Sequence, residues 1–146
     1  MAGEGKRLGE LLVEKRLVTE EQLKAALEEQ RTTKEFLGSL LVRKGRLRRE
    51  DLLQTLAEQM GLPFVRLDLE RVDWAVAKRF SPTAVIEHKS LPIAMDRTSV
   101  TVAVVNPLDL WGIESIEREA SGRVVRMVLV DEEDFKLALQ RYRQRS

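Results

Sequence analysis

The sequence predicts an α+β protein with two differently built parts. Leucines recur at helical spacing between residues 7 and 59, which predicts a helical region there. From residue 64 onward, β-branched residues gather in short runs that predict strands. Gly61-Leu62-Pro63 separates the two patterns with residues that a helix does not easily continue through. We therefore expect a helical unit over residues 1–60 and a small α/β unit over residues 61–146.

The elements follow from local signals. Thr19 and Gln22 match a capping box, so a helix is expected to start at Thr19. Ser81-Pro82 predicts the start of a short helix, with proline in its first turn. Residues 96–99 are short and polar, as in a hairpin turn, and Asp131 suits a helix N-cap. The second part should contain strands at 91–95, 100–105 and 124–130, and helices at 108–120 and 131–143. This order predicts about three strands with helices packed on the sheet.

Composition excludes several classes of function. The chain has 146 residues, 43% of them hydrophobic, and a formal net charge of +1, which disfavours DNA or RNA binding by bulk electrostatics. It has no cysteine and a single histidine, His88, so neither a metal site nor a catalytic constellation is expected. No apolar run is long enough to insert into a membrane, and the N-terminus lacks a signal-peptide core, so a cytoplasmic chain is expected. Arginine outnumbers lysine 17 to 8, a hint of a thermophile.

An internal repeat is the most informative feature. Residues 7–30 and 36–59 align without gaps, and 11 of the 24 aligned pairs are identical. Such self-similarity indicates two copies of one helical hairpin, each with a tight turn near Arg16 or Gly45. Gly9 and Gly38 are expected at helix starts, where glycine lets a ligand approach the backbone and free N–H groups suit phosphate. Close helix packing is the alternative explanation for both glycines.

The repeat resembles a known pattern. Arg7-Leu8-Gly9, the terminal Gln30 and the near-copy after a five-residue spacer are similar to the N-terminal domain of type IV pilus assembly and type II secretion ATPases. Pro63, Leu91-Pro92, the strand at 100–105, Asn106-Pro107-Leu108-Asp109 and the closing helix extend the resemblance over nearly the whole chain. It implies a regulatory domain whose ATPase core lies downstream, and no phosphate-binding Gly-x-x-x-x-Gly-Lys-[Ser/Thr] loop occurs here.

The resemblance also implies a binding site. Some members bind cyclic di-GMP through the doubled motif, using an arginine before Leu-Gly, leucines and a terminal glutamine. The matching residues are Arg7, Leu8, Gly9, Leu23, Leu27, Gln30, Leu37, Gly38, Leu52, Leu56 and Gln59. The second copy has Phe36 in place of the arginine, and the first has Arg16 in place of the turn glycine. Phenylalanine can stack on a base but cannot form the hydrogen bonds of an arginine.

Residues outside the motif have structural and functional interpretations. Asp109 is expected to cap the turn after the strand, or to orient an arginine of the repeat and so join the site. The basic run 43–49 is a solvated turn or a contact for an anionic partner. Core packing is the first expectation for both tryptophans, with Trp74 packing one unit on the other. A partly exposed position at an interface is the alternative for Trp111, and His88 is expected at the surface.

Two functions remain open. The first is sensing, in which cyclic di-GMP lies across the repeats and alters the orientation of the unit relative to the motor domain. The second is docking on an inner-membrane platform protein of the pilus or secretion machine, without a small ligand. In either case the domain is noncatalytic and peripheral to the inner membrane through its partners.

Overall fold

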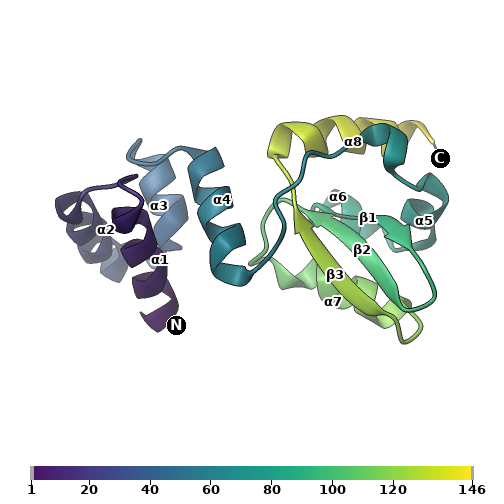
Figure 1. Ribbon diagram of the computed structural model, residues 1–146, viewed down its shortest axis with the longest axis horizontal. Helices are drawn as coiled ribbons and strands as arrows, with labels where there is room; N and C mark the ends of the chain where they lie inside the picture. Colours follow the sequence, from purple (N-terminus) through teal and green to yellow (C-terminus); the bar gives the residue numbers. More distant parts are fainter. Residues whose placement is uncertain (1, 146) are drawn as a thin grey trace. The chain divides into compact units, whose positions relative to one another are not determined.

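The computed structural model describes the backbone of residues 2–145 and the side chains of residues 8–145. It confirms the predicted α+β class. The chain divides into two compact units, Met1–Gly61 and Leu62–Ser146. The elements are α1 (Ala2–Glu14), α2 (Glu20–Thr33), α3 (Leu37–Arg43), α4 (Arg49–Met60), η1 (Leu69–Arg71), α5 (Trp74–Arg79), α6 (Pro82–Ile86), β1 (Ser90–Met95), β2 (Ser99–Val104), α7 (Leu110–Glu119), β3 (Val124–Leu129) and α8 (Glu132–Gln144) (Figure 1).

In the first unit, the turn between the two helices of each half lies at equivalent residues. α1 and α3 end at Glu14 and Arg43, and α2 and α4 begin at Glu20 and Arg49; both pairs are 29 residues apart. Each half therefore consists of a helix, a turn of five residues and a second helix. The apolar stripes of the four helices meet in one leucine-rich core.

Capping differs between the two halves. The predicted box at α2 is confirmed, since the Thr19 hydroxyl accepts from Gln22 N and the Gln22 side chain accepts from Thr19 N, both at 3.0 Å. The equivalent N-cap of α4 is Arg48, whose side chain makes no capping hydrogen bond. Gly61 is the C-cap of α4 and has φ 67°, the left-handed conformation that glycine adopts without strain.

The expected helix start at Gly9 is wrong. α1 begins at Ala2, so Gly9 lies inside the helix. No proline or turn precedes Leu8, and the helix extends back along the chain. Before the second copy, α2 ends with Lys34 at φ 62°, so α3 starts only at Leu37. Gly38 is therefore in the first turn of α3, as expected.

The second unit is a three-stranded sheet in the order β1-β2-β3. β1 and β2 pair antiparallel. β2 and β3 pair parallel, and the crossover helix α7 connects them along the chain. The predicted hairpin turn is confirmed: the Asp96 carboxylate accepts from Thr98 N and Ser99 N, each at 2.8 Å. Helices α7 and α8 lie on opposite sides of the sheet (Figure 1). The central strand β2 is buried along most of its length.

The apolar spacing predicts neither η1 nor α5. α5 begins because Asp73 accepts hydrogen bonds from Ala75 N and Val76 N, at 3.1 and 3.2 Å. Its first residue, Trp74, packs against the core of the second unit, and the Arg145 guanidinium lies 5.4 Å from the centroid of its ring. The structure thus gives Trp74 a packing role within its own unit.

Candidate ligand-binding site

The two motif glycines each make room for a leucine of the following helix. A Cβ built on Gly9 would lie 2.7 Å from Leu23 Cδ1. A Cβ on Gly38 would collide with Leu52 Cδ1 and lie 2.9 Å from Phe36 Cε2. Leu23 and Leu52 are equivalent positions of the two copies, so both glycines perform the same packing. Close packing of helices therefore explains the glycines without a ligand.

The six motif leucines fall into two groups. Four are at most 7% exposed and belong to the core of the unit: Leu8, Leu37, Leu52 and Leu56. Leu23 and Leu27, both on α2, are only partly buried against that core. The first copy therefore presents apolar side chains to solvent at two positions that the second copy buries.

The two terminal glutamines also differ. The Gln30 side-chain amide donates to the carbonyl oxygen of Glu35 at 3.0 Å, which ties the end of α2 to the loop before α3. Its equivalent, Gln59, is half-buried near the end of α4. Gln30 therefore shapes the connection between the two copies.

The motif has an arginine at two positions, which are Arg7 and Phe36 in this chain. The structure describes the side chain of Phe36 only. The side chain of Arg7 lies outside the described residues. Phe36 is the N-cap of α3, makes no side-chain capping bond and packs partly buried against the leucine core. An apolar contact thus stands where the motif has a cation.

The turns of the two halves share one backbone geometry. Arg16 has φ 60° and its equivalent Gly45 has φ 74°. Glycine adopts this left-handed conformation freely, whereas a side chain makes it costly. The first copy therefore keeps the turn shape of the motif in spite of its arginine.

Ion pairs neutralise part of the basic run. Arg43 Nη2 lies 2.5 Å from Glu35 Oε1 and 3.3 Å from Glu29 Oε2, and Lys44 Nζ lies 3.1 Å from Glu29 Oε1. The hydrogen bond from Lys44 lowers the pKa of Glu29, and the one from Arg43 lowers the pKa of Glu35. Arg48 Nη2 also lies 3.7 Å from Glu50 Oε2, so the protein's own carboxylates pair with at least three of the five cations.

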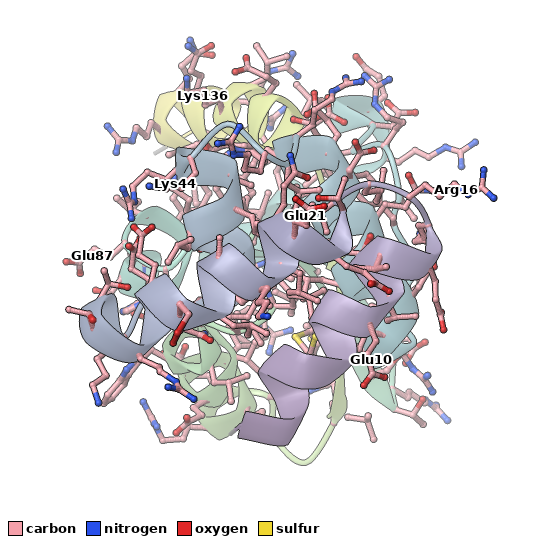
Figure 2. All side chains as sticks on the ribbon, turned by 90° about the vertical axis from the view of Figure 1, so that its left-hand side faces the viewer. Glu10, Arg16, Glu21, Lys44, Glu87 and Lys136 are labelled. Atoms are coloured by element: carbon pink, nitrogen blue, oxygen red, sulfur yellow. The ribbon has the colours of Figure 1, made fainter. Side chains whose placement is uncertain are left out.

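A hollow of about 340 Å³ lies beside these ion pairs, between α2 and α3. Its lining includes the apolar Ala26, Leu40 and Leu41, with Glu21 and Lys44 among its charged residues. Figure 2 labels Glu21 and Lys44 on the side of the first unit that faces the viewer. Of the predicted site residues whose side chains the structure describes, none lines this hollow.

Asp109 belongs to the second unit, and its side chain caps α7 by accepting from Trp111 N at 3.3 Å. This confirms the expected capping role. His88 was expected at the surface, but it is only about 30% exposed, and its Nδ1 lies 3.1 Å from Asp109 Oδ2. The two residues are 21 positions apart, so only the packing of α7 beside the start of β1 could reveal this pair.

A comparison with models of protein families identifies the family of this chain. The model described as the MshEN domain matches residues 60–146. The chain belongs to the MshEN domain family. This match covers the second unit, and the doubled motif precedes it in the chain.

Relatives of this MshEN domain occur in larger proteins. The type IV pilus assembly ATPase PilB of Thermus thermophilus is 32% identical over 139 residues, 94% of this chain and 16% of the relative. PilB of Myxococcus xanthus is 28% identical over 136 residues, 93% of this chain and 24% of the relative. Bacteriophage adsorption protein B of Escherichia coli is 28% identical over 123 residues, 84% of this chain and 16% of the relative. The chain therefore spans at most a quarter of these relatives.

Solved structures share the arrangement of the MshEN domain. The structure of MshE with cdg has a TM-score of 0.79 at 30% identity, over 92% of this chain and 97% of that one. The N-terminal domain of XpsE has a TM-score of 0.63 at 19% identity, over 93% of both chains, which shows a common fold. Among residues 2–145, the helices lack the combined length and hydropathy that crossing a bilayer requires.

Proposed function

We propose that this MshEN domain is the noncatalytic regulatory N-terminal domain of a type IV pilus assembly or type II secretion ATPase, and that its first unit binds cyclic di-GMP. The observation that carries the proposal is the likeness to MshE with cdg, at 30% identity over 92% of the chain. The ATPase motor would belong to the same parent protein or complex. The domain would work in the cytoplasm, held at the inner membrane by a platform protein.

The chemistry of the ligand fits the first copy of the motif. A cyclic dinucleotide carries two flat bases and two phosphates. Leu23 and Leu27 are partly exposed and offer an apolar surface to a base. Arg7, by its place in the motif, would bond a guanine edge or a phosphate.

The second copy offers less to such a ligand. Phe36 can stack on a base but forms no charge-assisted hydrogen bond, a loss of about 1.5–3 kcal/mol. Arg43 is engaged by Glu29 and Glu35, and Arg31 pairs with Glu28 at 3.3 Å. Compensation by either arginine would therefore require breaking an existing ion pair. We expect weak, asymmetric binding in which the first copy contributes most.

Calorimetric titration with cyclic di-GMP tests this proposal. The Phe36→Arg variant should bind about ten- to a hundredfold more tightly than the wild type, because it restores one charge-assisted contact. Arg7→Ala should abolish binding. Arg118→Ala, which changes an exposed arginine of α7, is the control and should leave the affinity unchanged. If neither the wild type nor Phe36→Arg binds cyclic di-GMP, the sensing function is excluded.

That outcome would favour the second candidate, docking on a protein of the inner-membrane platform. The observation behind it is that Phe36 packs on the core where ligand-binding members have an arginine. A helical unit that has lost this cation can still present a shaped surface to a protein. The wild type separates the two candidates: binding of cyclic di-GMP that Arg7→Ala abolishes supports sensing, whereas binding by Phe36→Arg alone means a degenerate site and favours docking.

A further inference from the structure

An exposed apolar cluster lies on the second unit. Trp111 is 71% exposed, Leu110 is 49% exposed and Ile86 is 37% exposed. Scattered apolar side chains are ordinary on protein surfaces, but a tryptophan this exposed beside other large apolar side chains is typical of an interaction site.

These three residues lie on two helices that pack against each other. Ile86 ends α6 and Leu110 begins α7. The His88–Asp109 contact of 3.1 Å joins the chain just after Ile86 to the residue just before Leu110. Gly112 fits closely beside this pair, since a Cβ there would lie 3.0 Å from the Cβ of His88. The apolar cluster is therefore built on a fixed junction of two helices.

Packing of the unit does not explain the tryptophan. α7 turns Gly112, Ile113 and Ile116 toward the interior, and all three are buried. Trp111 lies on the outer side of the same helix, where its backbone N–H is held by Asp109. Tryptophan is enriched among the residues that dominate binding energy at interfaces, so its exposure here is typical of an interaction site.

The charges around the cluster are mainly acidic. Glu87 directly follows Ile86, Glu114 lies one helical turn after Leu110, and both are exposed. Of the nearby cations, Lys89 lies 3.6 Å from Glu132, and Arg118 is one further turn along α7. Carboxylates beside an apolar cluster attract a partner with basic residues and repel anionic lipid headgroups.

We propose that Ile86, Leu110 and Trp111 form a docking surface for a basic amphipathic helix of a partner protein. The apolar face of that helix covers Trp111 and Leu110, and its lysines or arginines pair with Glu87 and Glu114. This surface belongs to the second unit and does not depend on nucleotide binding by the first. Binding to it and binding of cyclic di-GMP can therefore fail independently.

A fluorescently labelled synthetic helix with leucines on one face and lysines on the other is the probe. Its anisotropy with the whole chain should show saturable binding. Trp111→Ala should weaken that binding at least tenfold, as expected for a central aromatic, and Glu114→Gln about threefold. Leu137→Ala removes an apolar side chain of α8 that is 55% exposed and should leave the binding unchanged. Circular dichroism establishes that each variant is folded.

Four outcomes would overturn the proposal. A matched helix with glutamates in place of the lysines could bind equally well, which would remove the role of charge. Folded Trp111→Ala could keep full affinity, which would place the peptide elsewhere. Anionic vesicles could bind in a Trp111-dependent way, indicating a lipid surface. Sedimentation could reveal a dimer that Trp111→Ala dissociates, which would make a second copy of the chain the occupant.

Discussion

The two halves of the first unit place the turn between their helices at equivalent residues but form it by different means. Residues 15–19 and 44–48 make equivalent turns, one through Arg16 at φ 60° and one through Gly45 at φ 74°. α2 has a capping box at Thr19, whereas α4 starts at Arg48 without a side-chain cap. A repeated fold thus tolerates local losses, because its shared leucine core stabilises both halves. The proposed nucleotide site would be less tolerant, since it needs particular exposed groups.

The largest expected difference concerns the two motif glycines. Gly38→Ala should destabilise the protein by about 2 kcal/mol, because its methyl group would be wedged between Leu52, which is buried, and Phe36. Gly9→Ala should cost far less, since the partly exposed Leu23 can move aside and alanine favours a helix interior by about 0.5–1 kcal/mol over glycine. Urea unfolding followed by circular dichroism measures both. Equal losses would show that both halves are packed with the same rigidity.

The next largest loss of stability should come from removing a helix cap. Thr19→Ala removes a hydrogen bond to Gln22 N and should destabilise the protein by about 1 kcal/mol. Arg48→Ala, at the equivalent position, removes no capping bond and should change the stability by less than about 0.5 kcal/mol. Thermal unfolding of the two variants compares them directly. A large loss in Arg48→Ala alone would indicate that the second half depends on contacts outside its cap.

At the turns, the two substitutions should have small effects of opposite sign. Arg16→Gly should stabilise the protein by about 0.5 kcal/mol, because relief of the left-handed strain slightly exceeds the extra entropy of an unfolded glycine. Gly45→Ala should destabilise it by about 1 kcal/mol for the reverse reason. Chemical denaturation of both variants against the wild type resolves these signs. Destabilisation by Arg16→Gly would mean that the arginine side chain makes a contact that outweighs the strain.

Much of the fold could be predicted from local patterns. The capping box at Thr19, the hairpin turn at Asp96 and the N-cap at Asp131 depend on hydrogen bonds within three residues, which sequence spacing reveals. The apolar pattern did not predict η1 and α5, because such short helices have too few apolar positions to show a helical period. Their signal was the capping aspartate, as at Asp73.

The candidate site was less predictable. Motif spacing identifies Leu23 and Leu52 as equivalent, yet one is partly exposed and the other buried. Exposure depends on which neighbouring helix covers a residue, and a local motif does not contain that information. The same holds for Phe36. The sequence shows that this position has no arginine, and only the structure shows that the side chain packs against the leucine core.

The sequence by itself determined the α+β class, the helical repeat and the family resemblance, because these depend on periodicity, turn residues and self-similarity along the chain. Only the tertiary structure decided that Gly9 lies inside a helix, that His88 contacts Asp109 and that Trp111 is 71% exposed. Each of these depends on residues distant in sequence or on where a helix is free to begin. Such contacts are set by packing between elements, and a linear pattern specifies only the elements themselves.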